Sequence, residues 1–63
     1  MIILRELLGK IDKNTYIEIY EKRQCIADGY SDYLRDNFAL QGKRVVGLNT
    51  SLEGILIMVK END

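Results

Sequence analysis

The chain has 63 residues, of which 46% are hydrophobic and 30% charged, and its formal net charge is −1. This length allows one domain, residues 1–63, with a small core, because a chain of this size buries only about 60% of the surface that it exposes when unfolded. The nearly balanced charge gives no long-range field that would attract nucleic acid or an anionic membrane surface.

Cys25 is the only cysteine, so the chain cannot form an internal disulfide, and we expect a cytoplasmic location. No apolar stretch approaches the roughly 20 residues that a membrane-spanning helix needs, and Arg5 and Glu6 interrupt the apolar N-terminal segment. Neither a signal peptide nor a membrane partner is therefore expected. Cys25 itself is interpreted as a small buried apolar residue.

The first expected element is a helix over residues 2–10. Its leucine and isoleucine residues recur on one helical face, and Gly9 stands where the helix would end. So short a helix is unstable alone in water, because helix nucleation is costly. We therefore expect its apolar face to pack against a sheet formed by the following segments.

Two strands are expected next, over residues 15–20 and 24–28, joined by a short charged turn. The first is rich in residues that favour strands, and alternation places its two isoleucines on one face. The opposite face carries Tyr16, Glu18 and Tyr20. One apolar face and one mixed face are typical of an antiparallel sheet that covers a core on one side.

A second helix is expected over residues 32–40. Ser31 precedes it and is expected to cap it by accepting a backbone N–H. Tyr30, Leu34 and Phe38 are spaced by four, which predicts one apolar stripe along this helix.

The segment 43–60 is the part of the chain richest in β-branched residues, and it predicts two apolar strands joined by a polar turn. The second strand, residues 55–59, is apolar on both faces, so either both faces are covered or one is an interface. Gly47 interrupts the first strand and indicates a β-bulge or a close approach to the backbone.

Strands that are neighbours in the sequence pair most easily as antiparallel hairpins. The order of elements therefore predicts an α+β fold, α-β-β-α-β-β, in which two short helices cover a small, mostly antiparallel four-stranded sheet. A rolled small barrel with the helices as plugs is the alternative.

No set of residues indicates catalysis. The chain lacks histidine, the commonest general base and metal ligand, and a single cysteine cannot form a thiolate metal site. Asp32 and Asp36 lie one helical turn apart, which a solvated helix face explains. No glycine pattern typical of phosphate binding occurs. We therefore expect no enzyme, no catalytic or metal-binding residue and no cofactor.

The tyrosines are the most suggestive residues, because tyrosine combines a large contact area with one polar tip and is enriched at interfaces. Ordinary packing, either in the core or half-exposed, is the first interpretation for them, and a protein interface is the second. The candidate interface consists of Tyr16, Glu18, Tyr20, Tyr30, Tyr33, Leu56 and Met58.

The opening LRELLGKIDKNTYIEIYE is followed by a short charged turn, a tyrosine-containing helix and a closing segment V-V-x-L…I-L-I-M-V-K. This pattern resembles small uncharacterised proteins of bacterial and prophage genomes. The resemblance implies a cytoplasmic accessory protein and assigns no functional residue.

The leading hypothesis is a non-enzymatic protein-interaction or accessory module that binds a protein partner or itself as a homodimer. A dimer would bury apolar surface that so small a chain cannot bury alone. The alternative is a nucleic-acid-associated regulator that binds single strands by stacking bases on strand tyrosines beside scattered basic residues. Its candidate residues are Tyr16, Tyr20, Lys22, Arg23, Lys43 and Arg44.

Overall fold

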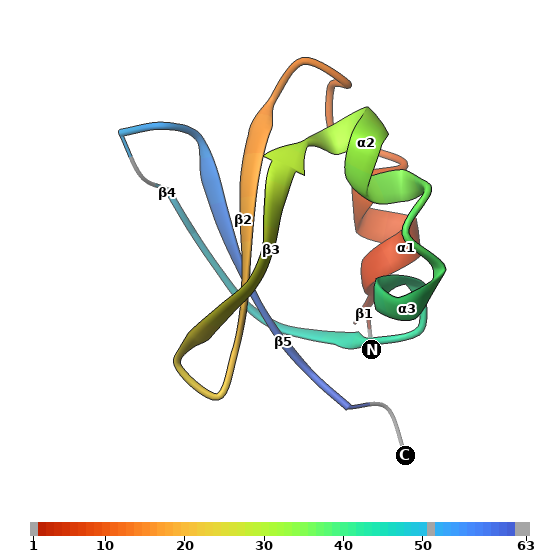
Figure 1. Cartoon of the computed structure of the whole chain (residues 1–63), viewed down its shortest axis with the longest axis vertical. Helices are drawn as coiled ribbons and strands as arrows, with labels where there is room; N and C mark the ends of the chain where they lie inside the picture. Colours follow the sequence, from red (N-terminus) through yellow and green to blue (C-terminus); the bar gives the residue numbers. More distant parts are fainter. Residues whose placement is uncertain (1, 51, 62–63) are drawn as a thin grey trace.

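The computed structural model of the chain describes residues 2–50 and 52–61 (Figure 1). In chain order its elements are β1 (Ile2–Ile3), α1 (Leu4–Leu8), β2 (Tyr16–Glu21), β3 (Gln24–Tyr30), α2 (Ser31–Arg35), α3 (Phe38–Gln41), β4 (Arg44–Thr50) and β5 (Ile55–Lys60). The described helices lie together on one side of the sheet, and none lies on its other side (Figure 1). The predicted α+β class is therefore confirmed.

The strands form one mixed sheet in the order β1-β4-β5-β2-β3. The central strand β5 is parallel to its neighbour β2, which places Ile19 beside Ile57, whereas the other pairs are antiparallel. The prediction of four mostly antiparallel strands and two helices is thus wrong in detail: the described residues form five strands and three helices. The barrel alternative is also wrong, because β1 and β3 are the two edges of an open sheet.

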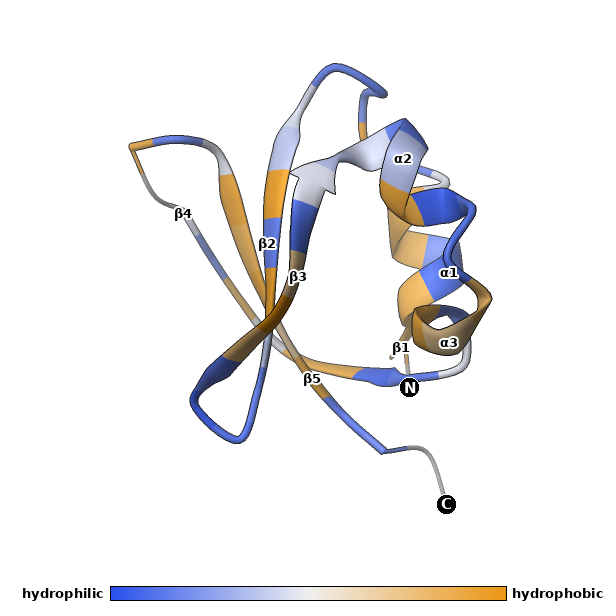
Figure 2. Ribbon diagram, in the orientation of Figure 1, coloured by the Kyte–Doolittle hydropathy of each residue, from blue (hydrophilic) through white to orange (hydrophobic). Residues whose placement is uncertain are grey.

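The core lies between the inner face of the sheet and the three helices. Figure 2 shows apolar segments of β2, β5 and α1 in the parts of the ribbon that enclose this layer. The buried apolar residues are Leu4, Leu8, Ile17, Ile19, Leu34, Leu40, Ile57 and Val59. Burying an aliphatic side chain of this size contributes roughly 1.5–3 kcal/mol, so this small set holds the fold together.

The N-terminal helix is shorter than the expected segment 2–10. Ile2 and Ile3 are extended and pair with β4, and the amide of Leu4 donates to the carbonyl of Lys43 at 2.8 Å. Branched residues favour extended backbone, and β4 offers an unpaired edge that satisfies their backbone groups. The expected end of the helix is confirmed, because Gly9 caps α1 and its amide donates to the carbonyl of Arg5.

The expected helix over 32–40 is divided into α2 and α3. The side chain of Asn37 accepts a hydrogen bond from the amide of Ala39 at 3.1 Å and starts α3 as its N-cap. An asparagine that binds the backbone in this way competes with a continuous helix. The predicted apolar stripe is consequently broken: Leu34 is buried, whereas Phe38 is 89% exposed. No helix in the described ranges is long and apolar enough to cross a membrane.

Ser31 does not cap α2 as predicted. It is the first helical residue, it is fully buried, and its hydroxyl donates to the carbonyl of Leu8 at 3.3 Å. The guanidinium of Arg35 donates to the same carbonyl at 2.9 Å and to that of Ile11 at 2.6 Å. These bonds join α2 to one carbonyl at the end of α1 and to another in the loop that follows it, and they fix α2 against α1.

The β4–β5 hairpin confirms the two strands expected in the C-terminal segment. Both interpretations of Gly47 hold. The register shifts between Val45 and Gly47, and the terminal methyl of Met58 lies 2.6 Å from the place that a Cβ atom on Gly47 would occupy. The bulge and the missing side chain together let Met58 lie across β4.

Candidate protein-interaction surface

The sheet has one face against the helices and one that no described helix covers (Figure 1). Alternation along β2 turns Ile17 and Ile19 toward the helices, so the residues between them point the opposite way. The strand registers place cross-strand partners of those residues on the same side. We call this side the open face, and it carries Tyr16, Glu18, Tyr20, Asp28, Tyr30, Leu56 and Met58.

Six of the seven candidate interface residues therefore share the open face, and Tyr33 does not. Tyr33 lies on α2, is 69% exposed, and places its ring over Gly29 on the helix side of β3. Gly29 pairs with Ile17, whose side chain faces the core. The position of Tyr33 depends on how α2 leaves β3, which alternation within the strands does not reveal.

Two tyrosine rings pack against each other at one end of the open face. The ring centroids of Tyr16 and Tyr30 are 5.8 Å apart, and the rings are nearly perpendicular at 83°. The hydroxyl of Tyr16 donates to Oδ2 of Asp28 at 2.7 Å. Edge-to-face contacts and hydrogen bonds of this kind hold the rings in place before any partner binds.

Carboxylates keep two of these tyrosines protonated. The hydrogen bond to Asp28 raises the pKa of Tyr16 to about 12, helped by the loss of hydration and by the charges of Glu53 and Glu18. The charge of Glu18, whose carboxylate accepts a 3.4 Å hydrogen bond from Tyr20, raises the pKa of Tyr20 above its usual 10.0. Both rings are therefore neutral contact groups at physiological pH.

A shallow hollow of about 530 Å³ occupies the middle of the open face and extends to the β2–β3 turn. Its lining residues are Tyr20, Lys22, Arg23, Val46, Asn49, Leu56, Met58 and Val59. Val46 is 56% exposed and Met58 is 40% exposed, so two large apolar side chains face solvent here. The candidate list omitted Val46, although alternation from its neighbour Val45, which is partly buried against the core, would have placed it on this face.

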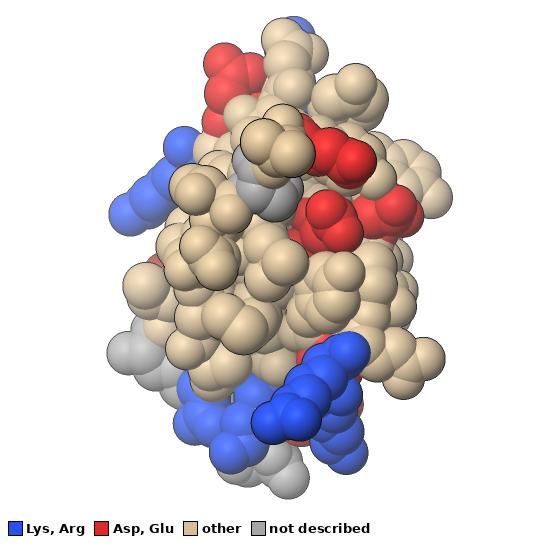
Figure 3. All heavy atoms as spheres, turned by 90° about the vertical axis from the view of Figure 1, so that its left-hand side faces the viewer, with Lys and Arg blue, Asp and Glu red and all other residues tan. Residues whose placement is uncertain are grey.

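In the middle of this face acidic side chains lie above an uncharged centre and a cluster of basic side chains lies below it, and one further basic side chain lies at the upper left edge of the view (Figure 3). We call Glu18, Asp28 and Glu53 the acidic end; these are the residues whose charges act on Tyr16. Lys22, Arg23 and Lys60 form the basic end, beside two adjoining hollows. Lys22 and Arg23 form no salt bridge with any residue in 2–50 or 52–61.

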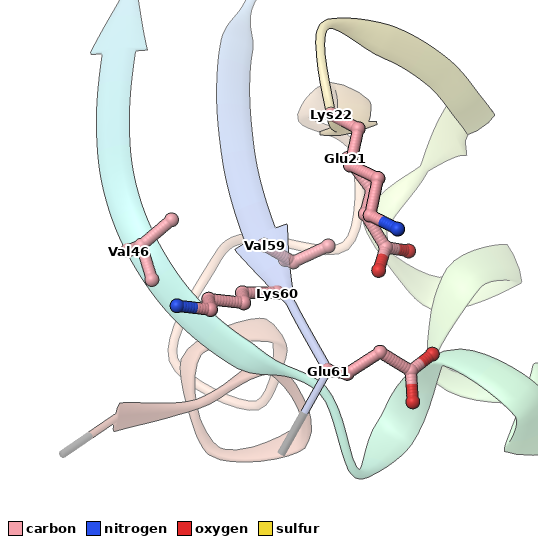
Figure 4. Close-up of a pocket in the computed structure, with 6 residues that line it drawn as sticks. All are labelled: Glu21, Lys22, Val46, Val59, Lys60 and Glu61. Atoms are coloured by element: carbon pink, nitrogen blue, oxygen red, sulfur yellow. The ribbon is translucent and has the colours of Figure 1, made fainter. Parts of the chain in front are cut away.

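The second hollow, of about 430 Å³, lies at the basic end between β4 and the end of β2 (Figure 4). Figure 4 shows Lys60 running across the sheet toward Val46, whereas Glu61 points the other way. The carboxylates of Glu21 and Glu61 bind Lys43 at 2.9 and 3.0 Å. These hydrogen bonds raise the pKa of Lys43, so its charge is already paired within the molecule.

The residues of the nucleic-acid hypothesis are only partly brought together. Tyr20, Lys22 and Arg23 line one hollow, but Lys43 is occupied by two carboxylates. Arg44 is half-buried, and its Nε has no hydrogen-bond partner among the described residues. The acidic end lies on the same face as the tyrosines, where a phosphate backbone would be repelled.

Cys25 is exposed, so its interpretation as a buried apolar residue is wrong. It lies on the edge strand β3 opposite Tyr20, next to a register shift, and its thiol donates to the carbonyl of Ala27 at 3.5 Å. Within the described part of the chain, no group of three or more histidine, cysteine or acidic side chains could hold a metal ion.

Comparisons with protein-family models, with curated proteins and with solved structures found no match to this chain. The open face is therefore the feature from which a function can be inferred.

Proposed function

We propose that the protein is a non-enzymatic protein-interaction module whose binding surface is the open face of the sheet. The observation that carries this proposal is the exposure of Val46 and Met58, next to the half-buried Leu56 and two tyrosines, on a sheet face that no described helix covers. A sheet that is apolar on both faces gains stability when its second face is also covered.

The composition of the face supports a protein partner. Tyrosine and methionine are enriched at the centres of protein interfaces, and charged residues are enriched at their rims. Here Tyr20 and Met58 are neighbours at the centre, since β2 and β5 pair at these positions, and the charged ends lie on either side. Strand backbone and the two tyrosine–carboxylate hydrogen bonds limit the entropy lost on binding.

The same charges make a nucleic acid the weaker candidate. Binding to single strands requires a continuous positive track beside the aromatic rings. On the open face the carboxylates of Glu18 and Asp28 accept hydrogen bonds from the hydroxyls of Tyr20 and Tyr16. A strand that stacked on these rings would bring its phosphates near two negative charges.

Affinity capture with matched variants tests the proposal. Tagged wild-type protein is incubated with a lysate of the native host and compared with Met58→Lys, on the open face, and with Phe38→Lys, which changes an exposed apolar residue on the helix side. We expect the wild type and Phe38→Lys to capture the same proteins and Met58→Lys to lose them, with circular dichroism showing that all three are folded. Equal capture by Met58→Lys, or a wild type that binds neither another protein nor a second copy of itself, would overturn the proposal.

A further inference from the structure

We infer that the open face binds the open face of a second copy of this chain, in a two-fold dimer that places the acidic end of each protomer on the basic end of the other. This inference rests on the proposed function and names its partner. The partner is identified by the charges on the face. Because the face has one acidic end and one basic end, two copies of it are complementary to each other.

The segregation of charge fixes the orientation. Suppose that a two-fold axis lies between the two sheets and runs perpendicular to the line from the acidic end to the basic end. Glu18 and Asp28 of each protomer then meet Lys22 and Arg23 of the other, and the contact occurs twice by symmetry. A two-fold axis along that line would instead place like charges together, which is unfavourable.

The apolar centre lies where the axis would pass. Tyr20, Val46, Leu56 and Met58 line one hollow between the two charged ends. In a face-to-face dimer these side chains bury one another and exclude water from the middle of the interface, while the ion pairs lie at its rim.

The surface that such a dimer needs is within reach of the chain. Its accessible surface is 4485 Å². An interface of standard size covers about 800 Å² per partner, which would be roughly a fifth of this surface. Because the monomer's core consists of a few aliphatic residues, a second buried layer would add appreciably to its stability.

Charge reversal followed by mixing tests the inference. In one variant, Lys22→Glu/Arg23→Glu makes both ends acidic; in the other, Glu18→Lys/Asp28→Lys makes both ends basic. Size-exclusion chromatography with light scattering should show a wild-type dimer at micromolar concentration and at least a tenfold weaker association of each variant alone. An equimolar mixture of the two variants should form dimers again, because opposite charges then meet at both ends.

The orientation is tested by salt. Added salt should weaken the wild-type dimer, since opposite charges meet in it. A wild-type dimer that tightens with salt would have like ends together and would overturn the inferred arrangement. Dimers formed equally well by both charge-reversed variants, or folded variants that do not associate when mixed, would also overturn it.

The outcome separates this inference from the proposed function. If the wild type is monomeric by light scattering and captures another protein that Met58→Lys loses, the open face is an interaction surface and the dimer is wrong. If the wild type is monomeric and captures nothing, both are wrong.

Discussion

The hydroxyl of Tyr16 on β2 donates a 2.7 Å hydrogen bond to Oδ2 of Asp28 on β3. The two residues lie on the same face, because Asp28 pairs with Glu18, two positions along the strand from Tyr16. The bond closes one end of the open face and ties the edge strand β3 to its neighbour β2. It also exists only while the phenol keeps its proton.

The first prediction concerns this bond. The hydrogen bond to the Asp28 carboxylate, together with its negative charge, raises the pKa of Tyr16 to about 12. Asp28→Asn removes that charge, so the pKa of Tyr16 should fall toward 10.0. NMR titration of ring-labelled tyrosine measures it directly. Asp36→Asn, an exposed carboxylate at the end of α2, is the control and should leave Tyr16 unchanged. An unchanged Tyr16 titration in Asp28→Asn would contradict the assignment.

The second prediction is a loss of stability at alkaline pH. The folded-state pKa values of Tyr16, Tyr20 and Lys43 are all raised. The unfolded pKa is 10.0 for the two tyrosines and 10.5 for Lys43. Below these values each group contributes its full stabilisation, and this stabilisation is lost as the pH rises through the folded-state pKa. Urea midpoints should be constant up to about pH 10 and decline above it, and less steeply in Asp28→Asn. A midpoint that rises over this interval would show that the sign is wrong.

The third prediction separates the core from the surface. Ile57 is fully buried between its strand partners Ile19 and Leu48, so Ile57→Ala should cost roughly 2–5 kcal/mol, a large share of the stability of so small a protein. Leu52→Ala changes a fully exposed leucine and should cost less than about 0.5 kcal/mol. Urea unfolding at one fixed protein concentration compares the two. Equal midpoints would mean that the core is assigned to the wrong residues.

The fourth prediction concerns the turn before β5. Gly54 has φ +156°, and a Cβ atom there would collide with the backbone oxygen of Tyr16, which cannot move without shifting β2. Gly54→Ala should therefore destabilise the fold by about 1–3 kcal/mol. Gly42→Ala is the matched control, because a Cβ atom there meets nothing within 4 Å. Thermal unfolding of both variants measures the difference, and a harmless Gly54→Ala would mean that the turn has another conformation.

The fifth prediction concerns the ion pairs of Lys43. The side chain of Glu21 is 14% exposed, so Lys43→Met would leave a largely buried carboxylate without its partner and should cost about 1–3 kcal/mol. The side chain of Glu61 is 69% exposed, so Glu61→Ala should cost at most about 1 kcal/mol. Adding Glu21→Gln to Lys43→Met should recover part of the loss. No recovery in this double variant would show that the isolated charge is not the cause.

The amino-acid sequence by itself determined the local features of this protein. Strict alternation in β2 separates Ile17 and Ile19 from the tyrosines beside them, and the turn-forming residues after β4 separate the last two strands. These signals depend on neighbours one to four positions away, so they identified the α+β class and the alternating faces within single strands, whereas the strand registers placed six candidate interface residues on one sheet face.

Only the tertiary structure decided which strands became neighbours. Two of these contacts are strand pairings between distant parts of the chain, Ile19 with Ile57 and Ile2 with Val45. A third is the packing of Tyr33 over Gly29, which keeps the tyrosine away from the open face. Such contacts form because they give the best burial for the whole chain, and no short-range pattern encodes that choice. The uncovered face of the sheet follows from the same choice, since all three described helices pack on the side where the buried aliphatic residues of β2 and β5 lie.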